Sequence, residues 1–311
     1  MNSEIKFDIP AVHDFSGIKK LVQEKTAERK PNAVLVAPSD IDMLKSFLQA
    51  AEEKLLTPII IGDEKLLKAN CDKHSLDCSN AHIIDLVEPL MALQTALKMA
   101  EAGEVDLIVK GRYHIDEFVE TCINPDNNFQ TGTISHIGVF KTAEYGKLLL
   151  VTDSFVNVEP DLKTKLALIT NAVKVAEALT IPEPKTALLA AVEVIYPQMP
   201  VTVDAAVISK MSDRRQIKGT VVEGPVSFDI AVDKGAAIAK GMGNSPVAGQ
   251  ADILVAPNIE TANGVLKAVS LFTELEIGGI LLGGRVPVAL SLDYDSAENK
   301  YNSLLLGLLL A

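Results

Sequence analysis

Cysteine is scarce in this sequence. Only Cys71, Cys78 and Cys122 occur among 311 residues, and no two of them have CxxC spacing. An odd number of cysteines without paired spacing argues against a disulfide framework and against a tetrahedral metal site. We therefore expect no metal site and a protein of the reducing cytoplasm.

Basic residues are also in short supply. The 29 Lys and Arg are outnumbered by 41 Asp and Glu, the formal net charge is -12, and no run of five or more basic residues occurs. Such a charge repels the phosphates of nucleic acids and anionic membrane surfaces, so neither is an expected partner. A small anion can still bind a local basic pocket.

No apolar stretch is long enough to cross a membrane. The N-terminal segment has no apolar signal-peptide core, and the longest terminal apolar run, residues 304–311, falls well short of a spanning helix. Such a helix needs roughly 20 residues. We expect a chain that neither enters nor crosses a membrane.

Several well-known catalytic motifs are missing as well. The sequence has no GxSxG elbow, no GxxxxGK[ST] phosphate loop and no HExxH zinc motif. The glycine-rich stretch 241–249 follows a helical pattern rather than a strand, so a dinucleotide-binding loop is a weak interpretation of it.

The hydrophobic pattern instead indicates an α/β protein. With 48% hydrophobic residues and no low-complexity tract, the chain is long enough for a large core, and we expect two lobes. From residue 33, short β-rich apolar runs alternate with longer amphipathic segments, which is typical of βαβ units around a mostly parallel sheet. The strands expected in the first lobe are 33–39, 57–63, 82–86 and 105–112, and the helices flanking them include 40–55 and 88–104.

The rhythm changes near residue 131. Two strand-like runs, 134–140 and 147–153, are separated by only six residues, so we expect an antiparallel hairpin there. We place a lobe boundary just before it, with residues 1–130 plus 284–311 in the first lobe and 131–283 in the second. The second lobe is expected to contain helices near 160–179, 201–211, 227–240 and 260–272, alternating with strands at 185–193, 219–224, 251–257 and 277–284. A last helix, 296–309, is expected to pack back on the first lobe.

Candidate ligand contacts follow the strands, because open parallel sheets bind ligands outside the carboxyl ends of their strands. Five stretches carry polar residues there: 110–112, 135–136, 223–229, 257–267 and 283–300. Each also has a purely structural interpretation. Residues 110–112 can be a strand-ending turn, Ser135 and His136 a buried core pair, and Ser227 and Ser296 the starts of helices.

Taken together, these segments resemble the phosphate acetyltransferase and phosphate butyryltransferase family. The resemblance rests on "VKG" near residue 110, "TGTISHIGVF" at 131–140, "VEGPVSFDIAV" at 222–232, "ADILVAPNIETANGVLK" at 251–267 and "PVALS...DSAENK" at 287–300. It extends from about residue 30 to the end of the chain, and it is closest to the butyryl branch.

The resemblance implies a fold and a reaction. The implied fold is the two-lobed α/β fold of isocitrate and isopropylmalate dehydrogenases, with mostly parallel sheets, an interlobe cleft and a homodimer built mainly on the second lobe. The implied reaction is reversible transfer of a short-chain acyl group between CoA and phosphate, with the CoA thiolate attacking in a ternary complex. CoA or acyl-CoA and phosphate are then the partners, and no cofactor, metal or nicotinamide is required.

The resemblance also implies site residues. Ser291 would donate a hydrogen bond to the transition state, and either Asp295 or Glu298 would be the base, since the register of this carboxylate differs between the two branches. The residues expected to bind substrate are Lys110, Arg112, Ser135, His136, Asn258, Asn263, Gly284, Arg285 and Ser296.

Two departures from the family pattern affect this hypothesis. Butyryl-type members carry "SRADS" where this chain has "LDYDS", so the family arginine falls on Asp293, and a second family arginine falls on Gln130. Replacing a bidentate phosphate clamp with an acid would cost several kcal/mol of binding. A cation from Arg112, Arg285 or the stretch 213–218 would have to substitute, and we prefer Arg285.

Other hypotheses follow from the same departures. The chain can instead act on a different substrate, or be a CoA-binding or regulatory homologue that has lost catalysis together with the family arginines. A dehydrogenase of the same fold is a weaker alternative, because the sequence shows neither the metal-binding aspartate cluster nor the cofactor loop that such an enzyme needs.

Overall fold

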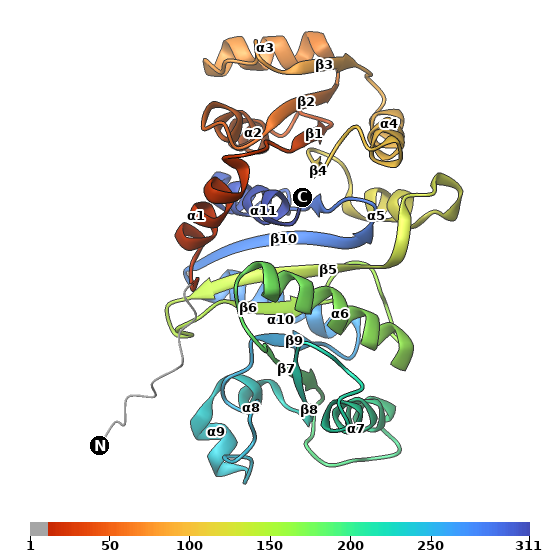
Figure 1. Cartoon of the computed structure of the whole chain (residues 1–311), viewed down its shortest axis with the longest axis vertical. Coiled ribbons are helices and arrows are strands. Elements are labelled where there is room, and N and C mark those ends of the chain that lie inside the picture. The colour runs from red at the N-terminus through yellow and green to blue at the C-terminus, as the bar shows by residue number, and fades with distance from the viewer. Residues whose placement is uncertain (1–11) are drawn as a thin grey trace. The chain divides into compact units, whose positions relative to one another are not determined.

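The computed structural model describes residues 12–311, which divide into two compact units (Figure 1). The split unit combines Phe15–His136 with Glu276–Ala311, and the middle unit comprises Ile137–Leu275, with which residues 12–14 also group. We expected the lobes to divide after residues 130 and 283, whereas the units divide after residues 136 and 275. The difference arises because β5 (Gln130–Thr142) is one long strand that belongs to both units.

The split unit contains a sheet whose strands come from both of its chain segments. The order is β3-β2-β1-β4-β11-β10, and β10 alone runs antiparallel to its neighbour β11. Five neighbouring strands are thus parallel, which confirms the βαβ pattern expected from the sequence. The strand bounds are β1 (Asn32–Val36), β2 (Thr57–Gly62), β3 (His82–Asp85), β4 (Leu107–Lys110), β10 (Leu275–Gly284) and β11 (Val288–Ala289).

Helices cover this sheet, and the last of them is nearly all buried. The helix α11 (Ala297–Leu310) packs against α1, α2, β4 and β11, and its leucines from Leu304 to Leu309 are buried. The prediction that the final helix returns to the first lobe is confirmed. The other helices of the split unit are α1 (Phe15–Thr26), α2 (Ile41–Glu52), α3 (Glu64–His74), α4 (Pro89–Ala102), α5 (Ile115–Ile123) and the 3-10 turn η1 (Pro125–Asn127).

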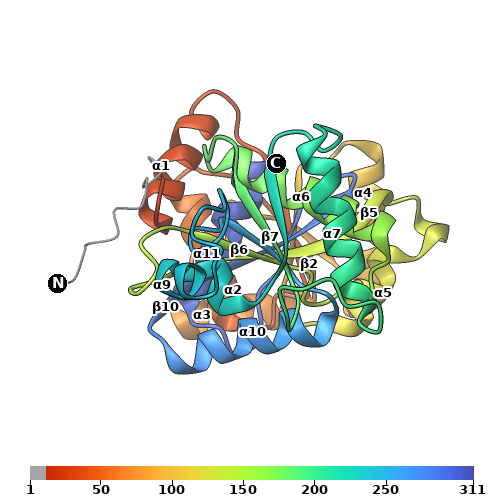
Figure 2. The ribbon, with the colours of Figure 1, turned by 90° about the horizontal axis from the view of Figure 1, so that it is seen from below.

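The middle unit begins with the predicted hairpin. From Ile137 onward β5 pairs antiparallel with β6, and the order continues through β9, β7 and β8 as parallel neighbours. Figure 2 shows α6 and α10 on opposite sides of these strands, so both faces are covered. The bounds are β6 (Leu149–Thr152), β7 (Lys185–Leu189), β8 (Val221–Val226), β9 (Ile253–Val255), α6 (Leu162–Ala178), α7 (Pro200–Asp213), α8 (Phe228–Val232), α9 (Lys234–Ala239) and α10 (Ile259–Phe272).

One predicted helix of the middle unit is wrong. Residues 227–240 form two short helices, α8 and α9, and Asp233 between them has extended backbone angles. Its carboxylate accepts a hydrogen bond from the Ala236 N–H and so caps α9. Aspartate favours helix starts over helix interiors because its side chain competes for backbone donors. Within residues 12–311, no helix has the length and apolar character needed to span a membrane.

Candidate functional site

Three neighbouring strands of the split unit end side by side. Val36 of β1 pairs with Lys110 of β4, and Ala289 of β11 pairs with Val109. The polar stretches 37–40, 110–112 and 291–295 follow these strand ends. Because the three strands are parallel, their carboxyl ends meet at one edge of the sheet, which is where α/β proteins bind ligands.

Gly111 allows two of these strand ends to approach closely. A Cβ atom at this position would come within 2.2 Å of the Ala37 carbonyl oxygen and 2.4 Å of the Val36 carbonyl oxygen. The main-chain N–H groups of Gly111 and Arg112 donate hydrogen bonds to these same carbonyls. The missing side chain therefore keeps the end of β4, and with it Lys110, against the end of β1.

Lys110 is a buried cation with an exposed partner. Its side chain is only 2% exposed, and its Nζ donates hydrogen bonds of 3.2 Å to the Gly111 carbonyl oxygen and to Asp293 Oδ1. The Asp293 side chain is 63% exposed. A buried ammonium is costly without a counter-charge, so the Asp293 carboxylate neutralises Lys110 from the solvent side.

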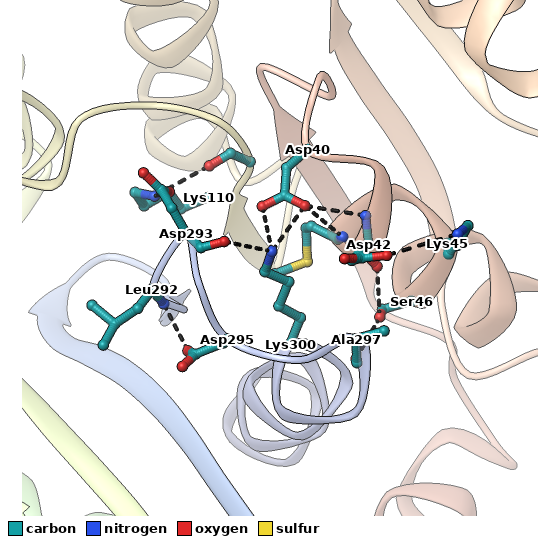
Figure 3. A network of polar contacts seen from close by, with 12 residues as sticks. Asp40, Asp42, Lys45, Ser46, Lys110, Leu292, Asp293, Asp295, Ala297 and Lys300 are labelled. Atoms are coloured by element: carbon teal, nitrogen blue, oxygen red, sulfur yellow. Dashed lines mark hydrogen bonds and ion pairs between the residues drawn. The ribbon is translucent and has the colours of Figure 1, made fainter. Parts of the chain in front are cut away.

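The side chain of Lys300 contacts the main chain of the same loop. The Lys300 ammonium is buried, lies 2.7 Å from Asp40 Oδ2, and donates a hydrogen bond of 3.2 Å to the Asp293 carbonyl oxygen. Figure 3 shows Asp293 engaged by both lysines, Lys110 at its carboxylate and Lys300 at its carbonyl. The position of the Asp293 backbone is thus fixed by a buried ion pair.

Asp295 lies in the same loop and is half-buried. Its Oδ2 accepts a hydrogen bond of 2.8 Å from the Leu292 N–H. Burial raises the pKa of Asp295 above that of an ordinary aspartate, and this effect outweighs the Leu292 hydrogen bond and the nearby charges of Lys300 and Lys110. The other predicted base, Glu298, is exposed in the first turn of α11. A carboxylate with a raised pKa is better suited to accept a proton near neutral pH.

A cavity of about 710 Å³ opens beside this loop within the split unit. Asp293 and Arg112 both line it, together with three glutamates, Glu88, Glu117 and Glu120. Among the cations expected to replace the missing family arginine, Arg112 therefore shares a cavity with Asp293. Carboxylates therefore outnumber the single guanidinium group in the lining of this cavity.

Three further predicted residues lie on β10, β11 or the loops that follow them. Arg285 is exposed, and its Nε donates a hydrogen bond of 2.8 Å to the Asn128 carbonyl oxygen. Gly284 leaves room for the Phe129 ring, which a Cβ atom would approach to 2.3 Å. Ser291 is buried, 5% exposed, just beyond β11. These contacts explain Arg285 and Gly284 structurally, and any role in binding substrate stays a prediction.

Ser135 and His136 are both buried in β5. Burial lowers the pKa of His136 to about 3, so the imidazole is neutral at physiological pH. Its Nε2 lies 2.8 Å from where a Cβ atom of Gly279 would be, so the glycine makes room for the ring. This placement agrees with the interpretation of the pair as core residues, and a substrate contact by either residue stays a prediction.

The remaining predicted residues begin or line helices. Asn258 caps α10 by accepting a hydrogen bond from the Thr261 N–H, and Asn263 donates one of 3.2 Å to the Ser154 carbonyl oxygen, both within the middle unit. In the split unit, Ser296 caps α11. The predicted cap role of Ser296 is confirmed, while substrate binding by these three residues stays a prediction.

Asp40 and Lys300 were not predicted as site residues from the sequence. One signal was available, because Lys300 is a single lysine on the same helical face as Leu304 and Leu308, which are buried. A lysine in such a stripe needs a buried partner, but sequence alone does not identify an aspartate 260 residues earlier. Among residues 12–311 there is no group of three or more His, Cys, Asp or Glu side chains that could hold a metal ion.

Comparisons with known proteins find relatives over most of the chain. Residues 90–307 match the family described as phosphate acetyl/butaryl transferase. The chain is 39% identical to a phosphate butyryltransferase of Clostridium acetobutylicum, covering 94% of this chain and 96% of the relative. It is 34% identical to a phosphate acetyltransferase of Rhizobium meliloti, covering 94% and 92%.

Solved structures show the same fold. A branched-chain phosphotransacylase of Enterococcus faecalis superposes with a TM-score of 0.76 at 26% identity, covering 89% of this chain and 98% of that one. A 4-hydroxythreonine-4-phosphate dehydrogenase of Salmonella typhimurium, 14% identical with a TM-score of 0.53, shares the fold alone. The expected dehydrogenase-like α/β architecture is thus confirmed, and the chain belongs to the phosphate acetyltransferase and phosphate butyryltransferase family.

Proposed function

We propose that this chain catalyses reversible transfer of a short-chain acyl group between CoA and phosphate. Its membership of the phosphate acetyl/butyryltransferase family, over nearly its whole length, carries this proposal. The names of its relatives favour an acyltransferase over the non-catalytic homologue considered from the sequence. The residues at the ends of β1, β4 and β11 supply the groups that such a reaction needs.

The first need is a site for phosphate. Phosphate oxygens are bound by ammonium and guanidinium groups, and both are present at this strand edge. Lys110 is buried and held in place by Gly111, and Arg112 lines the adjacent cavity. We propose that these two cations bind the phosphate group, and that Arg112 takes the part for which Arg285 was preferred from the sequence.

The second need is a base. The thiol of CoA has a pKa near 8.5, so most of it is protonated at neutral pH. We propose that Asp295, whose pKa is raised by burial, accepts the thiol proton. The sulfur then attacks the carbonyl carbon of the acyl phosphate, and the bond from this carbon to the phosphate oxygen breaks. Phosphate leaves with the bonding electron pair.

The third need is a donor for the carbonyl oxygen, which gains negative charge during the attack. We propose Ser291 for this role, because it lies at the end of β11 immediately before the loop that carries Asp293 and Asp295. Removing one such donor typically lowers turnover by a factor of about 100 or more. No reactant changes oxidation state, so the proposed reaction has CoA as a substrate and uses no nicotinamide.

The cellular compartment and the oligomeric state are also proposals. Cys71, Cys78 and Cys122 are free thiols, which supports a reducing compartment such as the cytoplasm. We further propose a homodimer built on the middle unit, for which light scattering coupled to gel filtration is the direct measurement. A mass near 33.3 kDa would identify a monomer and overturn this part of the proposal.

The test of the activity is thiol release from purified protein. Acetyl-, propionyl-, butyryl- and isobutyryl-CoA are each incubated with and without phosphate, and free CoA is measured with a thiol reagent. Phosphate-dependent release is expected, and it should fall by a factor of about 100 or more in Ser291→Ala while the thermal midpoint stays close to wild type. Tight CoA binding without release from any of the four substrates would instead indicate the non-catalytic homologue.

A further inference from the structure

Two lysine–aspartate pairs of the split unit contact one loop, and they differ sharply in burial. The Lys300 ammonium contacts both oxygens of Asp40, at 2.7 and 3.0 Å, and the exposed fractions of the two side chains are 3% and 12%. The Lys110 ammonium reaches a single oxygen of Asp293 at 3.2 Å, and that aspartate is 63% exposed. The first pair is enclosed by protein, and the second is open on one side.

This difference decides which lysine is available to an incoming anion. Replacing Asp40 would require taking an enclosed carboxylate out of the protein, and Asp40 also caps α2 through the N–H groups of Asp42 and Met43. Asp293 already lies at the surface, and an incoming anion restores the counter-charge that the buried Lys110 needs. An anion can therefore take the place of the Asp293 carboxylate at small cost.

The backbone beside Asp293 does not need to move for this exchange. Lys300 holds the Asp293 carbonyl oxygen, and Asp295 holds the Leu292 N–H, so the loop is fixed on both sides of the side chain (Figure 3). Rotation of one exposed side chain is enough to release Lys110. Arg112 lines the same cavity as Asp293, so a second cation is available to the incoming anion.

We propose that Asp293 is a displaceable counter-ion, which neutralises Lys110 until a phosphate oxygen replaces its carboxylate. This inference rests on the proposed function for the identity of the anion. It makes Asp293 a residue that sets affinity and specificity for phosphate. A doubly charged phosphate displaces the Asp293 carboxylate more readily than a singly charged carboxylate ligand does. The reason is its greater attraction to Lys110 and Arg112.

The test is phosphate binding to the whole chain in the absence of CoA, measured by titration calorimetry with inorganic phosphate. Asp293→Asn keeps the shape of the side chain and removes its charge, and it should bind phosphate about fivefold more tightly than wild type. The matched control is Asp42→Asn, an exposed aspartate of the neighbouring α2 whose nearest cation, on Lys45, is 3.7 Å away. This control removes the same charge and should change phosphate affinity little.

A double-mutant cycle assigns the effect to Lys110. In a Lys110→Met background, phosphate binding should be weaker, and adding Asp293→Asn should no longer tighten it. Phosphate binding by Asp293→Asn that is no tighter than by Asp42→Asn would overturn the inference. So would an undiminished gain in phosphate affinity when Asp293→Asn is added to Lys110→Met.

The same variants separate this inference from the proposed function. Tighter phosphate binding by Asp293→Asn, with no acyl transfer by wild type, would support the counter-ion and refute the transferase. Acyl transfer by wild type, with the phosphate KM unchanged in Asp293→Asn, would support the transferase and refute the counter-ion. If both are right, the phosphate KM falls in Asp293→Asn while the KM for acyl-CoA stays unchanged.

Discussion

Lys300 and Asp40, 260 residues apart in the sequence, form an ion pair whose side chains are only 3% and 12% exposed. Lys300 belongs to the last helix of the split unit, and Asp40 caps α2. The pair therefore joins two helices below the loop that carries the proposed base. Its loss should affect both the stability of the split unit and the position of that loop.

Lys300→Met tests the contribution of this pair to stability. The substitution leaves Asp40 buried without its cation, and removing one partner of a buried pair typically costs about 3–5 kcal/mol. We expect a large drop in the urea midpoint. The control is Lys45→Met on α2, whose exposed pair with Asp42 spans 3.7 Å and should be worth less than about 1 kcal/mol. Similar midpoints for the two variants would contradict the prediction.

Asp295→Asn and Glu298→Gln decide between the two predicted bases. Asparagine cannot accept the thiol proton, so we expect turnover to fall by about 100-fold to 10,000-fold in Asp295→Asn. Glu298 is exposed in the first turn of α11, so Glu298→Gln should keep turnover near that of wild type. Steady-state kinetics in the direction of acyl-CoA formation, with saturating CoA and butyryl phosphate, measure both. The reverse order of effects would assign the base to Glu298.

The pH dependence of turnover follows from the same carboxylate. A base must be ionised, so turnover falls as pH drops through the pKa of Asp295. Burial raises this pKa, so the acid limb of the turnover profile should lie above pH 4, near which ordinary aspartates titrate. The measurement is turnover of CoA with butyryl phosphate from pH 4 to 8 for wild type and Asp295→Asn. An acid limb at the same pH in both proteins would assign it to another group.

Gly111→Ala tests the close approach of β1 and β4. The new methyl group would meet two backbone carbonyl oxygens, at 2.2 and 2.4 Å, and backbone atoms cannot move aside as a flexible side chain can. We expect a loss of about 1–3 kcal/mol in the free energy of unfolding, with reduced turnover because Lys110 is displaced. Gly132→Ala is the control, since no atom lies within 4 Å of its added Cβ. Equal urea midpoints for the two variants would refute the packing argument.

His136 should make stability sensitive to pH. Burial lowers its pKa to about 3 in the folded chain, against about 6.5 when exposed. Below pH 6.5 the unfolded chain therefore takes up a proton that the folded chain does not, and stability falls as pH drops toward 3. Between pH 7 and pH 5, wild type should lose about 2 kcal/mol more than His136→Gln. Urea unfolding at the two pH values measures this difference, and equal losses would show that His136 does not titrate as described.

Much of the fold was predictable because strands and helices have different hydrophobic periods. The hairpin of β5 and β6, the parallel strands of the split unit and the return of α11 all follow from local patterns and connection lengths. The positions of Lys110 and Arg112 after β4 were also predictable, because ligand residues follow parallel strands. The stretch 291–295 was likewise identified from its polar residues after an apolar run.

Other features depend on packing that local patterns do not contain. Lys300 pairs with Asp40 only because α11 lies against α2, and Arg285 is engaged by the Asn128 carbonyl only because β10 lies beside the start of β5. The break between α8 and α9 at Asp233 was missed because capping and helix interior residues look alike in an apolar pattern. The difference in burial between Asp293 and Asp40 likewise emerges only from the folded chain.

The two-segment construction of the split unit has a consequence for synthesis. The strand β11 lies between β4 and β10, and it comes from the segment Glu276–Ala311. Until that segment has been translated, the edge of β4 has no neighbour on this side, and unpaired strand edges favour aggregation. All strands of the middle unit, β5 to β9, are translated before that segment. Nascent chains of this protein should therefore depend on chaperone protection of the Phe15–His136 segment while the middle unit folds first.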